Sequence, residues 1–270
     1  MPRRAALAAV LVLLSTLSGC ADEPSSTGSA APTASPTASP SRDAATPAPA
    51  PSGSTGAPGG PTQTPAKKPA SRSKGGPLGS VRTTGVRAVA VTFDDGPHPE
   101  WTPKVLAHLR KAKVKATFCV VGVKVRSHPE LVARIVREGH SLCNHSWAHD
   151  LKLGEKSAAR IRADLRRTNQ EIRRAAPGAR VRYYRQPGGL WSPTVIKVAR
   201  ELGMTPLHWD VDPGDWAKPT AAVISKRVAR QARAGSIVLL HDGGGDRRHT
   251  TLACPEILRT LKRKYGITRL

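Results

Sequence analysis

The 270-residue chain contains few cysteines, few aromatic residues and few acids. Three of its four cysteines follow residue 20, so at least one stays unpaired, which excludes a fully disulfide-bonded scaffold. An apolar run near the start, AALAAVLVLLSTL, is too short to span a bilayer, which argues against a transmembrane helix. Only 19 acidic residues face 43 Lys and Arg, and the chain therefore has a formal net charge of +24.

The first twenty residues have the order of a signal peptide. MPRR supplies a positive start, the apolar run follows, and LSGC ends the segment with small residues before Cys20. This ending resembles a bacterial lipobox, in which Cys20 carries the lipid of the mature protein. An ordinary signal peptide with an incidental cysteine is the alternative.

Residues 21–82 consist mainly of Ser, Thr, Pro, Ala and Gly. Because such a segment buries too little apolar surface to offset its ordering entropy, we predict a disordered tether. Residues 83–270 are long enough for one well-buried domain. An anchor and a tether predict a domain at the extracellular face of the membrane that reaches into the cell wall, with release from the cell as the alternative.

The positive charge lies mostly in that domain. After residue 80 there are 36 Lys and Arg but only 16 Asp and Glu. A surface this basic favours polyanionic partners such as wall polymers or acidic lipids, and export argues against nucleic acid. Compositional drift toward Arg and Ala is the alternative explanation. We expect a monomer.

Hydrophobic periodicity predicts strands and helices in alternation, which is typical of parallel βαβ units and of an open or barrel-like α/β domain. The predicted strands are 88–93, 116–122, 140–144, 181–185, 205–209, 236–241 and 265–270. The predicted helices are 102–113, 128–138, 157–175, 192–202, 219–233 and 252–264.

The stretch VTFDDGPHP runs the first predicted strand into two adjacent carboxylates and a Gly-Pro turn. The carboxyl ends of strands are where α/β folds place their ligands. Two neighbouring carboxylates repel each other unless a positive group lies beside them. Asp94 and Asp95 therefore either face a cation or belong to an exposed Asp-Gly-Pro turn.

The third predicted strand leads into NHSWAH, where His145 and His149 are four residues apart. On one helical turn both imidazoles would project from the same face, a spacing that suits two ligands of one metal. Two surface histidines are the alternative. With Asp95 from another strand end, the pair forms a two-histidine, one-carboxylate set with open positions for water.

Other predicted strands bring ionisable residues to the same rim: Arg185 in YYRQPGG, Asp215 in WDVDPGDW and His241 in VLLHD. Four of the five tryptophans also lie near these strand ends. Indole rings stack on sugars, so we expect Trp216 and Trp191 to line a groove, with core packing as the alternative.

Cys119 and Cys143 lie in short apolar strands that the pattern allows to be neighbours. A disulfide between them and two buried free thiols are both open interpretations.

The ordered motifs TFDDGP, HSWAH, RQPGG, DPGDW and LLH resemble those of polysaccharide deacetylases of the NodB-homology type, carbohydrate esterase family 4. The resemblance covers residues 85–270. It implies a distorted (β/α) barrel with about seven parallel strands and one divalent metal ion, zinc ahead of cobalt, manganese or nickel.

The resemblance also implies a role for each matching residue. These are a catalytic base (Asp94), three metal ligands (Asp95, His145 and His149), a general acid (His241) with Leu239 beneath it, its carboxylate partner (Asp215) and an arginine that orients the base (Arg185). The family reads Arg-x-Pro-Tyr-Gly where this chain has Gly188 in place of the aromatic residue. Glycine keeps the backbone N–H that holds the oxyanion, but the ring is missing from the sugar subsite.

Amide hydrolysis at neutral pH fits these residues, because it needs a cation, a base beside the attacking water and an acid for the departing amine. We therefore expect a metal-dependent hydrolase that removes acetyl groups from a polysaccharide. The N-acetyl groups of peptidoglycan are the first expectation, chitin oligosaccharides and acetyl-xylan the alternatives, and a non-catalytic carbohydrate-binding module the last. A glycosidase is disfavoured, because the two acids belong to one coupled site.

Overall fold

Strands and helices alternate along residues 75–270, the part of the chain that the computed structural model describes. The strands are β1 (Val89–Asp94), β2 (Thr117–Val120), β3 (Ser141–Asn144), β4 (Tyr183–Tyr184), β5 (Thr205–Pro206), β6 (Ile237–His241) and β7 (Ile267–Thr268). The helices are α1 (Trp101–Ala112), α2 (Gly122–Ser127), α3 (Pro129–Arg137), α4 (Ala158–Ala175), α5 (Pro193–Glu201), α6 (Ala221–Gln231) and α7 (Arg248–Tyr265).

The predicted signal peptide, Cys20 and most of the predicted tether lie outside the described residues. Among the residues that the structure describes, no helix is both long enough and apolar enough to cross a bilayer.

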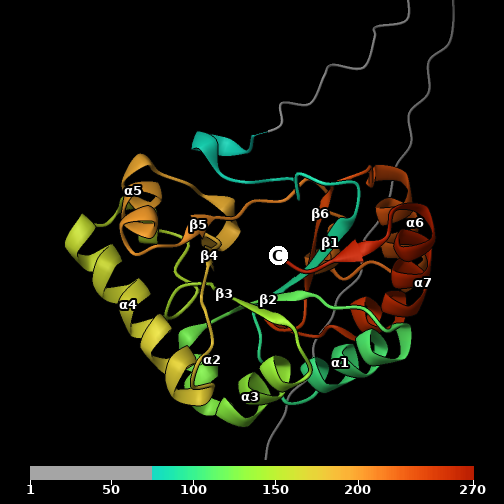
Figure 1. The fold of residues 1–270 in the computed structure, drawn as a ribbon, viewed down its shortest axis with the longest axis horizontal. Coiled ribbons are helices and arrows are strands. Elements are labelled where there is room, and N and C mark those ends of the chain that lie inside the picture. Colours follow the sequence, from blue (N-terminus) through green and yellow to red (C-terminus); the bar gives the residue numbers. More distant parts are fainter. Residues whose placement is uncertain (1–74) are drawn as a thin grey trace, which may run out of the picture. The chain divides into compact units, whose positions relative to one another are not determined.

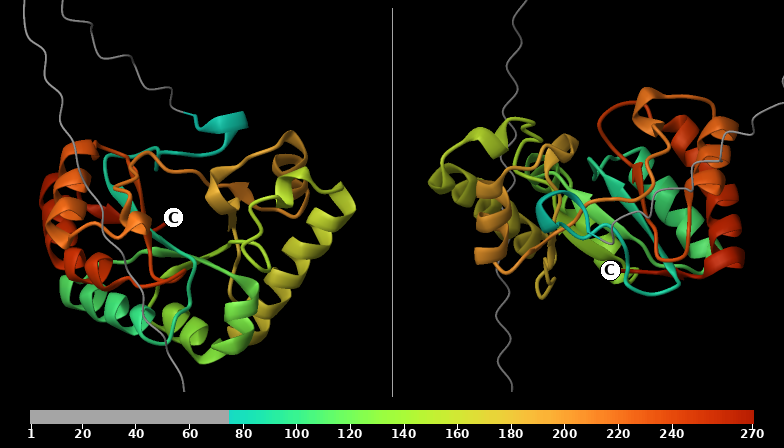
Figure 2. Two further views of the ribbon diagram at one scale, coloured as in Figure 1. Left: turned by 180° about the vertical axis from the view of Figure 1, so that it is seen from behind. Right: turned by 90° about the horizontal axis from the view of Figure 1, so that it is seen from above.

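All seven strands form one parallel sheet in the order β5-β4-β3-β2-β1-β6, with β7 paired to β1. The helices lie outside the strands, and β7 ends near the middle of the ring (Figures 1 and 2). After β5 the chain crosses toward β6, where Val211 bridges Val238 and extends the ring. The α/β prediction of a distorted barrel is confirmed.

Side chains alternate across the strands and divide the interior into two layers. In β1, Val89, Val91 and Phe93 belong to the large core under the helices. The residues between them point the other way, and Ala90 packs with Ile237 of β6 inside the barrel. This alternation decides which side chain reaches the rim where each strand ends.

Cys119 of β2 and Cys143 of β3 are register partners inside the barrel, and a disulfide joins them. The structure thus answers the question that the sequence left open. Cys254 in α7 is a buried free cysteine.

Several predicted boundaries differ from the observed ones. The short helix α2 was not predicted, and α7 begins at Arg248 instead of 252. Strands β4 and β5 have only two residues each. The N–H of Leu207 still donates to the backbone oxygen of Tyr184, but the next N–H, that of His208, donates to Val81 instead of β4. Val81, which the sequence analysis assigned to the tether, thus packs on the barrel.

Candidate active site

The predicted site residues converge at the carboxyl ends of the strands. Asp94 ends β1 and His241 ends β6, and the two are register partners. His145 lies two residues after Cys143 and Arg185 two residues after Tyr183, so each points to the same inward side of the barrel as that residue. Strand alternation therefore places these four side chains on one rim.

Asp95, His145 and His149 form a group of three potential metal ligands. Their donor atoms lie within 4.8 Å of one another. Oδ1 of Asp95 is 3.4 Å from Nε2 of His145 and 3.1 Å from Nε2 of His149. This oxygen is buried and has no hydrogen-bond partner among the described residues. A buried oxygen that faces two imidazoles without a hydrogen bond suits a cation bound between them.

The environment of each ligand supports that interpretation. Nδ1 of His145 donates a hydrogen bond to the backbone oxygen of Arg185 at 2.8 Å, which leaves the Nε2 lone pair facing Asp95. Burial opposes ionisation of Asp95, but the neighbouring imidazoles of His145 and His149 hold the pKa of its carboxyl well below its usual range. The donor set therefore matches zinc or a similar first-row ion.

The two histidines do not lie on a helical turn, and that detail of the sequence prediction is wrong. Residues 145–149 form a loop in which Ser146 (φ 64°) and His149 (φ 56°) adopt left-handed backbone conformations. The two rings still approach each other, with centroids 5.0 Å apart. Convergence of the imidazoles thus comes from loop geometry and not from the helical period.

Two glycines behind Asp95 were missed by the sequence reasoning. A Cβ at Gly243 would lie 2.1 Å from the backbone oxygen of Asp95, and one at Gly244 would lie 2.3 Å from its Oδ2. Only glycine permits that approach. The run of three glycines after LLHD was the available signal, because glycines at a strand end indicate close backbone contact.

Asp94 is held by Arg185. Nη1 of Arg185 donates to Oδ1 of Asp94 at 2.6 Å and to Oγ1 of Thr92 at 2.8 Å. Its remaining nitrogens donate to the backbone oxygens of Leu207 and His208. Both charges of the pair are almost completely buried and compensate each other. Oδ2 of Asp94 stays on the ligand side, 3.6 Å from Nε2 of His145.

His241 is held by Asp215, a residue at the start of a short 3₁₀ turn (Asp215–Ala217). Nδ1 of His241 donates to Oδ1 of Asp215 at 2.7 Å, and the His241 backbone N–H donates to Oδ2 at 2.9 Å. Thr250 donates to the same Oδ2. Burial lowers the pKa of His241, but Asp215 and the charges of Asp94 and Asp95 outweigh it and raise the pKa to about 9.

Arg247 and Asp242 also support the rim and were not predicted. The buried guanidinium of Arg247 donates to the backbone oxygens of Gly243 and Gly244, and over 3.5 Å to that of Asp215, which ties the two loops together. Asp242 accepts a hydrogen bond from Thr102, and burial raises the pKa of its carboxyl to about 7. Neither residue stands in a pattern that distinguishes it from surface Arg or Asp.

The remaining predicted site residues have mixed surroundings. Trp216 is 57% exposed, as a sugar platform requires, whereas Trp191 is half-buried and donates its indole N–H to His208. Gly188 has a left-handed backbone (φ 62°), and a Cβ there would lie 3.0 Å from Leu151. Leu239 is buried on the His241 side of β6. Their roles stay predictions.

A family model and similar characterised proteins both indicate the same family. The family model described as polysaccharide deacetylase matches residues 81–207. A chitooligosaccharide deacetylase of Sinorhizobium fredii is 41% identical over 160 residues, which is 59% of this chain and 74% of that protein. A peptidoglycan-N-acetylglucosamine deacetylase of Bacillus cereus is 38% identical over 180 residues, 66% of this chain and 83% of that protein.

Solved structures resemble the fold at similar levels of identity. A carbohydrate esterase family 4 pseudoenzyme from Bacillus anthracis matches with a TM-score of 0.65 and 30% identity over 70% of this chain and 66% of that chain. A family 4 carbohydrate esterase from Streptomyces lividans, in complex with acetate, matches with a TM-score of 0.61 and 32% identity over 67% of this chain and 91% of that chain. The chain belongs to the polysaccharide deacetylase family.

Proposed function

We propose that this protein is a metal-dependent deacetylase that removes N-acetyl groups from peptidoglycan. One observation carries the proposal. A buried carboxylate oxygen without a hydrogen bond faces two imidazoles, and this group lies on the same rim as the Asp94–Arg185 and His241–Asp215 pairs. A cation site, a base and an acid are the three elements that hydrolysis of an unactivated amide needs.

The cation would be held by Oδ1 of Asp95 and by Nε2 of His145 and His149. Two imidazoles and one carboxylate suit zinc, and cobalt, manganese and nickel accept the same donors. When bound, such an ion polarises an acetyl carbonyl and lowers the pKa of water.

Asp94 is proposed as the general base. Arg185 occupies Oδ1, so Oδ2 is the oxygen left on the ligand side to take a proton from the attacking water. Hydrogen bonds to Thr92, Leu207 and His208 fix the guanidinium of Arg185, and the guanidinium in turn fixes the Asp94 carboxylate. The base is therefore preorganised before substrate binds.

His241 is proposed as the general acid. Its Nδ1–H is committed to Asp215, so Nε2 is the atom that can deliver a proton to the departing amine. With a pKa raised to about 9, the imidazole is protonated at neutral pH. Asp215 aims the ring and maintains its charge, which makes it a positioning residue for this step.

The sugar subsite is proposed to lie beside Gly188. The missing aromatic ring leaves that side of the rim to Leu151 and Leu190, both about half exposed (48% and 56%). Gly188 would offer its backbone N–H to the oxyanion, and Trp216 an exposed indole face to the sugar. Trp191, which packs against Tyr184, would support this wall from behind.

Peptidoglycan is preferred among the candidate substrates because the predicted lipid anchor and tether would keep the domain at the cell wall. The similarity to a chitooligosaccharide deacetylase supports chitin oligosaccharides as the second candidate. A non-catalytic role, as in the similar pseudoenzyme, is disfavoured because Asp94 and His241 are both present and both paired.

Acetate release by residues 75–270 on peptidoglycan, chitin oligosaccharides and acetyl-xylan, followed by mass spectrometry, tests the proposal. The matched control is Asp94→Asn, which keeps the shape of the site. We expect zinc-dependent release that is fastest on peptidoglycan and ~10²–10⁴-fold slower in the control. Faster release from chitin oligosaccharides would make them the substrate in place of peptidoglycan. No release from any of the polymers would refute the proposed deacetylase activity.

The location is a separate proposal, namely a lipoprotein at the extracellular face of the membrane. Labelling of expressing bacteria with a fatty-acid analogue should mark the full-length chain and not Cys20→Ser. Equal labelling of both proteins would contradict the lipid anchor without affecting the enzyme.

A further inference from the structure

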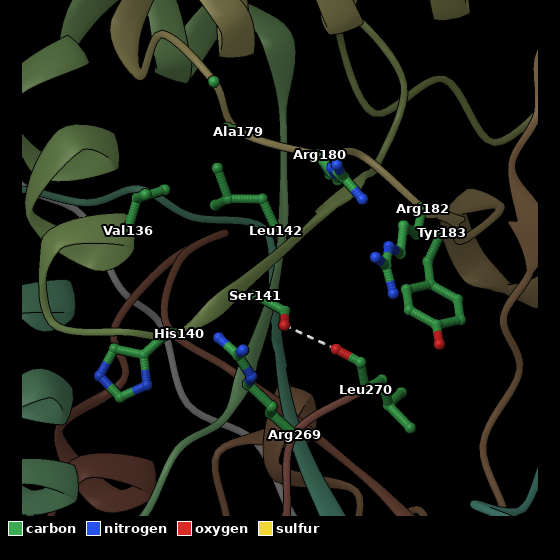
Figure 3. A pocket seen from close by; sticks show the side chains of 11 residues that line it. Val136, His140, Ser141, Leu142, Ala179, Arg180, Arg182, Tyr183, Arg269 and Leu270 are labelled. Atoms are coloured by element: carbon green, nitrogen blue, oxygen red, sulfur yellow. Dashed lines mark hydrogen bonds between the residues drawn. The ribbon is translucent and has the colours of Figure 1, made fainter.

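The barrel has a hollow at the opposite end from the candidate active site. It encloses about 450 Å³ and is lined by residues at the amino ends of β3 and β4 and after β7. Figure 3 shows Arg180 and Arg182, which precede β4, on one side of it and Arg269 across from them. The carboxyl-end rim and this hollow are thus separated by the length of the strands.

The hollow has an excess of one charge. Within residues 75–270, it is lined by three arginines and by no Asp or Glu side chain, and Leu270 brings the terminal carboxylate to its edge. The guanidinium groups of Arg180 and Arg182 have neither a hydrogen bond nor an ion pair within residues 75–270. Arg269 donates only to the backbone oxygen of Gly139. In the described part of the chain, no Asp or Glu side chain pairs with these three guanidinium groups, and the terminal carboxylate of Leu270, which also lies at the hollow, forms no ion pair with them.

The surroundings do not neutralise them. His140 also lines the hollow, and burial together with Lys115 lowers its pKa to about 4, so the ring adds no charge near neutral pH. Glu138, two residues before it in sequence, is already bound by Arg134 at 2.8 Å. Elsewhere in the described residues several arginines are paired, as Arg126 is with Glu171. The unpaired cluster is consistent with a ligand that supplies the negative charge.

Guanidinium groups bind phosphate in a bidentate manner, and several of them around one concave site favour a multiply charged chain. We propose that this hollow binds the phosphodiester groups of an anionic polymer, with Arg180, Arg182 and Arg269 as ligands. A concave site admits a flexible chain more readily than the flat headgroup layer of a bilayer. Because the hollow lies away from the rim, the protein holds this polymer while the active site is free for a glycan, and the inference does not depend on the proposed function.

The test compares two charge-matched double variants of residues 75–270. Arg180→Gln/Arg182→Gln removes two charges from the hollow, and Arg166→Gln/Arg230→Gln removes two exposed charges on α4 and α6. Binding of a synthetic glycerol phosphate polymer is measured by calorimetry at low and moderate salt. We expect the hollow variant to bind at least about tenfold more weakly with a shallower salt dependence, and the control to change much less.

Arg180→Lys/Arg182→Lys provides a second variant that keeps the charge but loses the planar fork, and we expect it to bind with intermediate affinity. Equal affinity of the hollow variant and the control would overturn the proposal. So would equal binding of polyglutamate, which shows recognition of charge alone, or stronger arginine-dependent binding to phosphatidylglycerol vesicles, which shows a membrane surface. Unchanged unfolding temperatures verify that the variants are folded.

Discussion

An arginine flanks each end of β4, and the two arginines differ in burial, ion pairing and hydrogen bonding. Arg185 at the carboxyl end is completely buried, ion-paired with Asp94, and donates hydrogen bonds to Thr92, Leu207 and His208. Arg182 at the amino end is exposed and has no such partner in the described part of the chain. Residue type alone therefore does not reveal a role.

The difference teaches how the two ends of the barrel are built. At the carboxyl end Asp94 is paired with Arg185 and His241 with Asp215, so these side chains are fixed and their protonation is controlled, as catalysis requires. At the amino end Arg180, Arg182 and Arg269 lie close together without acidic side-chain partners in the described residues, as expected of an anion-binding surface. Partnering and burial, more than composition, separate chemistry from binding.

The comparison predicts unequal effects of the same substitution. Arg185→Gln leaves the buried Asp94 without its counter-charge, so we expect a loss of ~3–5 kcal/mol in the free energy of unfolding and a rate at least ~10²-fold lower. Arg182→Gln should stay within ~0.5 kcal/mol and keep its rate. Urea unfolding and acetate release measure both. Similar losses in the two variants would remove the contrast.

Removal of the acid should slow the reaction but, unlike Arg185→Gln, leave the free energy of unfolding nearly unchanged. His241→Ala should lower the rate on an amide by ~10²–10⁴-fold and leave metal content unchanged. On an activated acetyl ester the loss should be smaller, because that leaving group needs less protonation. Equal losses on both substrates would show that His241 shapes the site and does not supply the proton.

Asp215→Asn should act more mildly, mainly through the pH profile. In the wild type the pKa of the His241 imidazole is raised from 6.5 to about 9. Its pairing with Asp215 therefore stabilises the fold fully below pH 6.5, and this stabilisation is lost, together with the proton, as the pH rises through about 9. A bound cation cancels part of the pull of Asp94 and Asp95, which places the alkaline limb of activity at or below that value. In Asp215→Asn the limb should move to lower pH. An unmoved limb would assign it to another group.

Much of this architecture follows from local patterns. Buried apolar runs predicted β1, β2 and β6, because burial on both faces leaves near-continuous apolar segments, and the alternation with helical patterns indicated the shorter strands. Motif order located Asp94, Asp95, His145 and His241, because strand ends are where the chain changes from apolar to ionisable. The short helix α2 escaped, because six residues carry too little periodicity.

Other features depend on contacts that no local pattern contains. The left-handed backbone of Ser146 and His149 replaces the expected helical turn, although the spacing of four residues is the same. Burial of Arg247 follows from the approach of two loops distant in sequence. The unpaired state of Arg180 and Arg182 is likewise visible only when their surroundings are known.

The smallest expected effect concerns the loop that carries both histidines. The guanidinium groups of Arg126 and Arg167 lie 4.7 Å and 3.5 Å from the ring centroid of Trp147, and the Trp147 backbone N–H donates to Oδ1 of Asp164. Trp147→Leu should weaken metal binding by about 10-fold through loop mobility and leave the rate at saturating metal nearly unchanged. A lower rate at saturating metal would instead place Trp147 in contact with substrate.

Metal content and rate of Asp94→Asn and Asp95→Asn, measured side by side with and without added zinc or cobalt, test the account most directly. Asp95→Asn should lose metal and recover some activity when metal is in excess, because a neutral oxygen replaces a charged ligand. Asp94→Asn should keep its metal and stay ~10²–10⁴-fold slower at any metal concentration, because it cannot accept the proton. Full metal occupancy in Asp95→Asn together with metal loss in Asp94→Asn would contradict the assignment of ligand and base.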